Sequence, residues 1–421
     1  HLGDDLERVH GGTLPGPAPT PVWAHGPDSG QSGRVRELVA VDLPGGPGFV
    51  DAVRRCWDRG DAVLPVPQRG PDEWRRAVLD ALRPTRVLGP DGDETAFEGG
   101  RPVEDGDAVV VATSGTTGAP KGAVHTHQGV EQAAYATAAA LGADPDVRWL
   151  ACLPLDHVGG LSVVTRALVT GAGLEVHPGF DAAAVDDAAA RGATHVSLVP
   201  AVLGRVDTAR WRTILLGGSA VPADRPANCV ATYGMTETFG GVVYDGLPLN
   251  GTAVRIAEED RAEDGSGHIE VATRSLLRCY RDGTDPVSAD GWYRTGDVGW
   301  VEPGTGRLHV DGRADDLVIT GGEKVWPHPV ESVLATHPLV AEVVVVGRPD
   351  PVWGQTVTAV VVPAGGPPTL EQLRTLALEH LPPAAAPRGL ELVAELPRTS
   401  LGKVRRNRAG HAHDRRPGTA D

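Results

Sequence analysis

The chain has 421 residues, a formal net charge of −16 and a hydrophobic content of 41%. This length accommodates two or three domains with a large core, and the excess of negative charge argues against nucleic acid or an anionic membrane as a partner. No apolar run approaches the roughly 18 residues of a membrane-spanning helix and no signal-peptide pattern is visible, so we expect a cytoplasmic protein.

The first part of the chain alternates between strand and helix patterns. Residues 38–43, 61–66 and 86–88 are typical of strands, whereas residues 47–59 and 71–82 carry apolar side chains at helical spacing. Such alternation predicts an α/β layer with a largely parallel sheet. The four cysteines, Cys56, Cys152, Cys229 and Cys279, form no C-x-x-C pair, and we interpret them as reduced, packed thiols.

The most informative segment is residues 109–127, VVVATSGTTGAPKGAVHTH. It begins with a β-branched run that predicts a buried strand. Its glycines let backbone N–H groups approach an anion, while hydroxyls and a lysine supply further donors. The segment is not a Walker A loop, which requires G-x-x-x-x-G-K-[ST]. We predict a phosphate-binding loop made by Thr113, Ser114, Gly115, Thr116, Thr117, Gly118 and Lys121.

The middle of the chain continues the alternation. Helical patterns cover residues 128–141, 161–169 and 181–191, and strand patterns cover residues 149–155, 195–199 and 211–216. The last of these strands runs into G-G-S-A. Glycine after a strand either forms a bare turn or admits a ligand to the backbone.

The final third of the chain changes character. Residues 250–312 are expected to form antiparallel strands joined by turns. Beyond them, helical patterns at 329–336 and 370–380 and strand patterns at 340–346 and 357–362 predict a compact α+β unit of domain size.

Five motifs together resemble those of the adenylate-forming superfamily, which contains acyl-CoA synthetases, peptide-synthetase adenylation domains and luciferases. They are T-S-G-T-T-G-A-P-K-G (113–122), Y-G-M-T-E (233–237), W-Y-R-T-G-D (292–297), D-G-R-A-D (311–315) and P-R-T-S-L-G-K (397–403). The resemblance covers about residues 38–410. It implies a large N-terminal α/β domain, residues 1–313, with parallel sheets and a small antiparallel part. A small mobile α+β domain, residues 314–421, would follow a hinge near Asp315.

The resemblance also implies the parts of an ATP site. Tyr233 would flank the adenine, Thr236 would bind the α-phosphate region, and Glu237 would hold Mg²⁺, which prefers oxygen ligands. Asp297 would accept the ribose hydroxyls, Arg313 would reach the ribose or a phosphate, and Lys403 would catalyse adenylation. The backbone around the nucleotide would include Gly217, Gly218 and Gly234.

The acid and thiol sites follow from the same resemblance. His157, Gly217, Gly218 and Ser219 would line the carboxylic acid pocket. After adenylation, rotation about Asp315 would withdraw Lys403 and bring Gly321 and Gly322 to the site, where coenzyme A displaces AMP. The short N-terminal region and the P-L-D-H-V-G-G-L string resemble the o-succinylbenzoate–CoA ligases, with another small aryl or acyl acid as the alternative.

Several alternatives remain open at this point. Arg166 and Arg205 lie near pocket motifs and are candidates for a second substrate carboxylate, although pairing at the surface is the commoner fate of an arginine. The thiol could belong to a carrier protein, but no G-x-D-S-L carrier motif is fused here. A non-adenylating relative would handle only a preformed acyl-adenylate, and the intact loop and Lys403 argue against it. The expected partners are therefore the acid, ATP and coenzyme A, and the sequence allows a homodimer.

Overall fold

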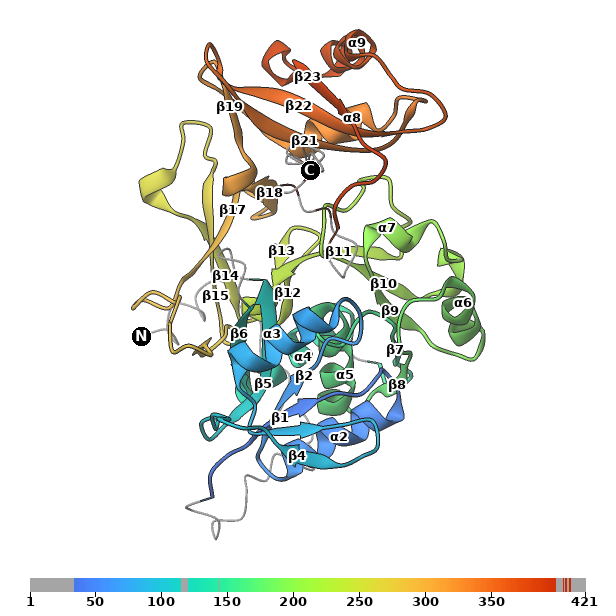
Figure 1. Cartoon of the computed structure of the whole chain (residues 1–421), viewed down its shortest axis with the longest axis vertical. Coiled ribbons are helices and arrows are strands. Elements are labelled where there is room, and N and C mark those ends of the chain that lie inside the picture. Colours follow the sequence, from blue (N-terminus) through green and yellow to red (C-terminus); the bar gives the residue numbers. More distant parts are fainter. Residues whose placement is uncertain are drawn as a thin grey trace, which may run out of the picture. The chain divides into compact units, whose positions relative to one another are not determined.

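The computed structural model describes residues 34–114, 120–142 and 144–398, together with Val404, Arg406 and Ala409 (Figure 1). The chain divides into two compact units. The first contains residues 1–255, 270–294 and 303–308, and the second contains residues 256–269, 295–302 and 309–421. No helix in the described part is long and apolar enough to span a membrane.

The first sheet of the first unit has the order β16-β6-β5-β2-β1-β3-β4. Its strands are β1 (Leu38–Val41), β2 (Ala62–Pro65), β3 (Arg86–Leu88), β4 (Glu94–Ala96), β5 (Asp107–Ser114), β6 (Pro120–Thr126) and β16 (Cys279–Tyr280). The central strands β5, β2, β1 and β3 are parallel. This part of the sheet matches the prediction, whereas β4, β6 and β16 pair antiparallel at its two sides.

Successive residues of the central strands enter two different cores. Val39 and Val109 pack with helix α2 (Pro47–Asp58), whereas Leu38 and Val110 pack with helix α3 (Asp72–Leu82). Because both faces of the parallel strands are buried, the strands are apolar at every position instead of alternating. This explains the continuous apolar runs in the sequence.

The predicted phosphate loop joins the antiparallel strands β5 and β6. Strand β6 was not predicted from the sequence, because PKGAVHT contains proline, glycine and lysine and lacks strand alternation. Gly122 is needed there, since a Cβ would lie 2.7 Å from Leu82 Cδ2 and 2.8 Å from Val110 Cγ1.

The second sheet has the order β13-β12-β11-β10-β9-β7-β8. Its strands are β7 (Arg148–Ala151), β8 (Gly173–Val176), β9 (His195–Leu198), β10 (Thr213–Leu216), β11 (Cys229–Met235), β12 (Gly240–Tyr244) and β13 (Leu247–Pro248). Strands β7 to β11 run parallel, and β12 and β13 are antiparallel. The predicted strand at 149–155 ends early, at Ala151.

Helices α4 (His127–Ala140) and α5 (Val158–Thr170) share one core with both sheets. Val130 of α4 and Leu161 of α5 belong to the same cluster as Val109 of the first sheet and Leu215 of the second. Helix α6 (Ala182–Ala190) contributes Val185 to a separate cluster with Leu150, Val196 and Ile214 of the second sheet. The short helix α7 (Pro200–Leu203) follows β9.

Strands β14 (Thr252–Ile256), β15 (Gly267–Thr273), β17 (Tyr293–Val301) and β18 (Leu308–Arg313) form a four-stranded sheet in that order. The C-terminal sheet has the order β20-β19-β22-β21, with β23 beside β22. Its strands are β19 (Val318–Thr320), β20 (Glu323–Val325), β21 (Val340–Asp350), β22 (Gly354–Pro363) and β23 (Gly389–Leu392).

The C-terminal α+β unit has its own core. Helices α8 (Pro327–Leu334) and α9 (Leu370–His380) place Leu334 and Leu373 against Val345 and Val357 of the sheet. Helix α8 begins two residues earlier than predicted, because proline is well tolerated in the first turn of a helix.

Candidate active site

The carboxyl ends of the parallel strands of the second sheet lie at one edge. Leu216 of β10 lies beside Leu198 of β9 and Ala231 of β11, so the residues that follow these strands emerge at the same level. In open α/β sheets, ligands bind outside this edge. The predicted residues Gly217, Gly218 and Ser219 follow β10, and Tyr233 to Glu237 end β11 or follow it.

Three side chains meet where the phosphate loop joins β6. The hydroxyl of Tyr280 donates a hydrogen bond of 2.8 Å to Oε1 of Glu237. Lys121 Nζ lies 5.2 Å from the centroid of the Tyr280 ring, within range of a cation–π interaction. Lys121 follows Pro120, the first described residue after position 114. Glu237 lies in the 3₁₀ turn η2 (Thr236–Thr238). A lysine and a carboxylate from two separate motifs thus share one tyrosine.

Tyr280 was not predicted as a site residue from the sequence. It belongs to the two-residue strand β16, where it pairs with Ala123 of β6, and such a short strand has no detectable periodicity. Burial, and then the neighbouring Glu237, raise the pKa of Tyr280 far above its ordinary value of 10.0. The phenol therefore stays protonated and remains a hydrogen-bond donor to the carboxylate.

The turn that carries Thr236 and Glu237 is held from within. The backbone N–H of Met235 donates to Thr238 Oγ1 at 3.0 Å, and that hydroxyl donates to the carbonyl of Gly240 at 2.7 Å. Phe239 has a left-handed φ of 54° and its ring lies 4.9 Å from that of the buried His125. Thr238 and Phe239, which were not singled out from the sequence, therefore hold the turn that carries Glu237.

Packing against neighbouring strands requires glycine at two positions of the site. A Cβ at Gly217 would overlap Oγ1 of Thr232 on the neighbouring strand, and a Cβ at Gly234 would overlap the carbonyl of Gly240. Gly218 has a left-handed φ of 81°. Close approach of β10, β11 and β12 is thus sufficient to require glycine at Gly217 and Gly234, whether or not a ligand also approaches them.

His157 is the N-cap of α5, beyond the carboxyl end of β7. Its Nε2 lies 3.5 Å from Oδ2 of Asp156. Burial lowers the pKa of His157, and the Asp156 carboxylate opposes that shift. His157 therefore begins the helix that follows the carboxyl end of β7, a strand that runs parallel to β10 and β11 in the same sheet.

The two arginines considered for a second substrate carboxylate do not meet there. Arg166 is nine residues beyond His157 on α5, about 13 Å farther along the helix, and its guanidinium lies 4.5 Å over the ring of Trp149. Arg205 is exposed and lies 5.1 Å over the ring of Phe180. The expectation of simple surface pairing is also wrong for Arg166, because only 5% of this residue is exposed.

Asp297 and Arg313 form an ion pair in the second unit. Arg313 Nη1 lies 3.3 Å from Asp297 Oδ1 and donates to the carbonyl of Thr295 at 3.1 Å. Gly296 has a φ of 75°, and a Cβ there would lie 2.9 Å from Arg313 Nη2. The glycine of the T-G-D motif therefore allows the guanidinium to lie across the backbone, and the structure brings these two predicted nucleotide residues together.

The remaining predicted residues of the second unit lie on turns. Asp315 is exposed in the 3₁₀ turn η4 (Ala314–Asp316). Gly321 and Gly322 connect β19 to β20 with φ values of 60° and 87°. A Cβ at Gly321 would lie 2.7 Å from the Trp353 ring, so this turn also needs glycine for packing. Lys403 and residues 115–119 lie outside the described residues, as does the side chain of Ser114.

Comparison with known proteins supplies the family. Residues 75–281 match the family described as "AMP-binding enzyme", and residues 329–403 match "AMP-binding enzyme C-terminal domain". A protein of Mycobacterium tuberculosis named "Probable 2-succinylbenzoate--CoA ligase" is 39% identical over 375 residues, which are 82% of this chain and 93% of that protein. This chain belongs to the AMP-binding enzyme family.

Solved structures agree with that family. The o-succinylbenzoate CoA synthetase MenE of Bacillus subtilis, in complex with the acyl-adenylate intermediate OSB-AMP, has a TM-score of 0.79 and 27% identity, covering 92% of this chain and 90% of that one. The same enzyme in complex with ATP and a magnesium ion has a TM-score of 0.78 and 26% identity, with 90% of each chain covered. The predicted fold class is confirmed, and the chain is an AMP-forming acyl-CoA synthetase.

The residues of this acyl-CoA synthetase fit a magnesium ion that is shared with nucleotide. Mg²⁺ is usually bound through one or two carboxylates together with substrate phosphates. Glu237 provides one half-buried carboxylate, oriented by Tyr280 and close to the phosphate-loop strand. Within the described ranges, no cluster of three or more His, Cys, Asp or Glu side chains could hold a metal alone. The phosphate oxygens would therefore complete the coordination.

The cysteines of the acyl-CoA synthetase are free thiols, and Cys56, Cys152 and Cys229 are buried. Burial raises the pKa values of Cys56 and Cys152 to about 12, so both remain protonated at neutral pH. Neither is suited to act as a nucleophile, because the thiolate is the reactive form.

Proposed function

We propose that this acyl-CoA synthetase converts 2-succinylbenzoate to its acyl-adenylate with release of pyrophosphate, and then transfers the acyl group to coenzyme A. The observation that carries the adenylation chemistry is the Lys121–Tyr280–Glu237 cluster beside the phosphate loop. The identity of the acid is supported by the relative from Mycobacterium tuberculosis and by the Bacillus subtilis synthetase in complex with OSB-AMP.

The first half-reaction brings two anions together. The acid carboxylate attacks the α-phosphorus, a P–O bond forms, and the bond to pyrophosphate breaks. Preorganised cations and N–H dipoles must neutralise the charge that develops. When bound, Mg²⁺ supplies Lewis-acid stabilisation of the phosphate oxygens. Lys121 neutralises charge at the phosphate loop, and Lys403, as a compact point charge, bridges the acid and the α-phosphate.

Four of the predicted residues bind the nucleotide in this proposal. Tyr233 flanks the adenine and Thr236 binds the α-phosphate region. Asp297 accepts hydrogen bonds from the ribose hydroxyls, and Arg313 then moves its guanidinium from Asp297 toward the ribose or a phosphate. The ion pair of 3.3 Å supports this role, because it holds both side chains in place before nucleotide binds.

The second half-reaction uses the predicted domain boundary. We infer a large domain of residues 1–313 and a small domain of residues 314–421 that turns about Asp315, whose backbone would absorb the change. Lys403 leaves the site and the Gly321–Gly322 turn enters it. The thiol sulfur of coenzyme A attacks the acyl carbonyl, loses its proton, and AMP departs with the former anhydride oxygen.

His157, Gly217, Gly218 and Ser219 line the acid pocket in this proposal. They are supported by their shared position at the carboxyl edge of the second sheet, where His157 caps α5 and the glycines follow β10. The pocket therefore lies beside Glu237 and Thr236, as attack on the α-phosphate requires.

The proposal is tested by pyrophosphate release with Mg·ATP across a panel of carboxylic acids that includes 2-succinylbenzoate. We expect release with 2-succinylbenzoate that increases when coenzyme A is added. Release with a different acid alone would replace the substrate. An increase with a phosphopantetheinylated carrier protein, but not with coenzyme A, would replace the thiol.

Lys403→Ala separates the two half-reactions. Removal of the bridging cation is expected to lower pyrophosphate release by about 100-fold or more, in line with the loss of one transition-state contact. Thioester formation from preformed acyl-adenylate and coenzyme A should continue and serves as the internal control. Unchanged pyrophosphate release would remove Lys403 from the catalytic set.

We also infer a cytoplasmic location, which is supported by free thiols throughout the chain and by the use of ATP and coenzyme A. A homodimer remains a prediction of the sequence analysis, and light scattering of the purified chain would test it.

A further inference from the structure

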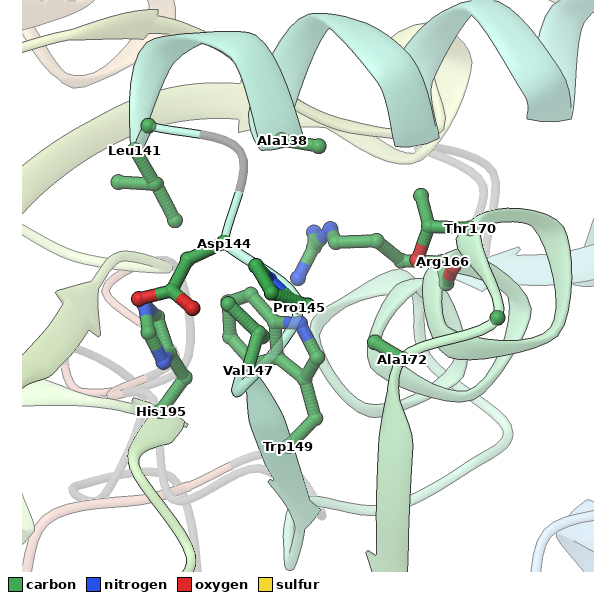
Figure 2. Close-up of a pocket in the computed structure, with 12 residues that line it drawn as sticks. Ala138, Leu141, Asp144, Pro145, Val147, Trp149, Arg166, Thr170, Ala172 and His195 are labelled. Atoms are coloured by element: carbon green, nitrogen blue, oxygen red, sulfur yellow. Dashed lines mark hydrogen bonds between the residues drawn. The ribbon is translucent and has the colours of Figure 1, made fainter. Parts of the chain in front are cut away.

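A cavity of about 310 Å³ opens between helices α4 and α5 and the start of the second sheet (Figure 2). This volume is at the lower end of the range for small-molecule sites. Its apolar walls come from Leu141 and Ala138 of α4, Val147 and Trp149 at β7, and Ala172 after α5. The cavity lies at the amino ends of the parallel strands, since Trp149 is the second residue of β7 and His195 is the first residue of β9. The candidate active site lies at their carboxyl ends.

Arg166 is the charged group that enters this cavity. Figure 2 shows its side chain extending from α5 toward Pro145 and Trp149. Only 5% of the residue is exposed. Its Nε and Nη1 atoms are buried and have no hydrogen-bond partner among the residues that the structure describes. A buried guanidinium with unmade hydrogen bonds is unfavourable, and stacking on Trp149 at 4.5 Å compensates for only part of the lost hydration.

The other polar groups of the cavity do not neutralise this charge. The Asp144 carboxylate is paired with the guanidinium of Arg212. The His195 ring lies 5.0 Å from Trp149, and its Nδ1 is hydrogen-bonded to Thr194 Oγ1 at 2.8 Å. Burial lowers the pKa of His195 to about 4, so the ring is neutral at neutral pH. Among the described residues that line the cavity, Arg166 therefore carries a positive charge with no carboxylate partner, and the surrounding walls are largely apolar.

We propose that this cavity is a second ligand site that binds a small carboxylic acid with an apolar, ring-sized body, its carboxylate paired with Arg166. A carboxylate fits the planar guanidinium as a bidentate partner. The apolar walls favour an organic acid over inorganic phosphate, which would leave most of its oxygens without donors. The site is separate from the acid pocket, because Arg166 lies about 13 Å along α5 from His157.

Binding of 4-fluorobenzoate, followed by ¹⁹F NMR titration of the full chain, tests the proposal without requiring turnover. The wild-type chain is expected to bind the probe with a dissociation constant of about 1 mM or below. In Arg166→Met, which keeps the bulk of the side chain, the dissociation constant should rise by about tenfold or more, as expected for loss of a charge-assisted hydrogen bond.

Two further variants make the result specific to the cavity. Ala138→Leu keeps Arg166 but fills part of the cavity from α4, so it should raise the dissociation constant of the probe by a similar factor. This variant still tests the proposal if Arg166→Met fails to fold. Arg205→Met, which removes an exposed arginine stacked on Phe180, should leave binding unchanged. Equal affinity in Ala138→Leu and the wild-type chain would place the probe elsewhere, the acid pocket included, and would overturn the proposal. Absence of binding up to about 20 mM, or displacement of the probe by equimolar inorganic phosphate, would also overturn it.

Discussion

The hydroxyl of Tyr280 donates a hydrogen bond of 2.8 Å to Oε1 of Glu237, and the same tyrosine ring lies 5.2 Å from Lys121 Nζ. Tyr280 reaches this position because β16 extends the first sheet beside β6, while Glu237 follows β11 of the second sheet. The backbone N–H of Leu277 also donates to the carbonyl of Glu237 at 2.7 Å. One tyrosine thus links the phosphate-loop lysine to the carboxylate expected to hold Mg²⁺.

Tyr280→Phe should impair the use of Mg·ATP. The substitution leaves the Glu237 carboxylate without its hydroxyl donor, and a hydrogen bond to a charged group contributes about 1.5–3 kcal/mol. We expect kcat/KM for ATP to fall by roughly 10- to 100-fold, and the magnesium concentration for half-maximal activity to rise. Pyrophosphate release measured over a magnesium titration reports both effects.

Tyr244→Phe is the matched control for this tyrosine. The Tyr244 hydroxyl is hydrogen-bonded to Thr137 at 3.0 Å inside the core, away from Glu237. This variant should lose about 1 kcal/mol of stability and keep the magnesium dependence of the wild-type enzyme. An identical magnesium response in both variants would contradict the role given to Tyr280.

Gly296→Ala should disturb the nucleotide site through Arg313. The backbone at Gly296 is left-handed, with φ 75°, and the added Cβ would lie 2.9 Å from Arg313 Nη2. We expect about 1 kcal/mol of destabilisation from the backbone and about a tenfold rise in the KM for ATP from the displaced guanidinium. Chemical denaturation and ATP titration measure the two effects separately.

Gly304→Ala isolates the backbone part of that effect. Gly304 has a similar φ of 87°, but no atom of the described residues lies within 4 Å of its Cβ position. It should lose comparable stability while its KM for ATP stays at the wild-type value. If Gly296→Ala and Gly304→Ala behave alike in both assays, the contact of Gly296 with Arg313 does not affect the KM for ATP.

Gly217→Ala tests whether packing alone explains this glycine. The added Cβ would overlap Oγ1 of Thr232, which donates to the carbonyl of Leu216 at 3.0 Å. We expect a loss of about 1–3 kcal/mol of stability from overpacking, partly restored in the double variant Gly217→Ala/Thr232→Ala. If activity returns together with stability, the glycine serves packing. Activity that stays low in a stable double variant would instead support close approach of a substrate.

The buried His125 should make stability depend on pH. Burial lowers its pKa from 6.5 to about 4, so the folded state favours the neutral ring. Its contribution is complete above pH 6.5 and is lost as the pH falls toward 4, by up to about 3 kcal/mol. In His125→Phe, the free energy of unfolding should fall less steeply between pH 6.5 and 4 than in the wild-type chain. His380→Gln, at an exposed position, should keep the wild-type slope; an equal slope in His125→Phe would contradict the prediction.

The sequence by itself determined the α/β layers, the central strands and the family. Val109 to Val111 and Val39 to Val41 are apolar at every position because both faces of their sheet are covered, and such runs are visible locally. The motifs around Lys121, Glu237 and Asp297 were equally local, since each is a contiguous string. The residues of these motifs could therefore be predicted as site residues before the structure was known.

Only the tertiary structure decided which of these groups meet. Tyr280 contacts Glu237 because a two-residue strand pairs in one register with β6, and no local pattern encodes that pairing. Arg166 was a candidate for a second substrate carboxylate or for pairing at the surface, but the orientation of α5 places it, buried, over Trp149 at the other edge of the sheet. Contacts between residues far apart in the chain depend on sheet order, register and helix orientation, which result from the packing of the whole core and not from any single segment.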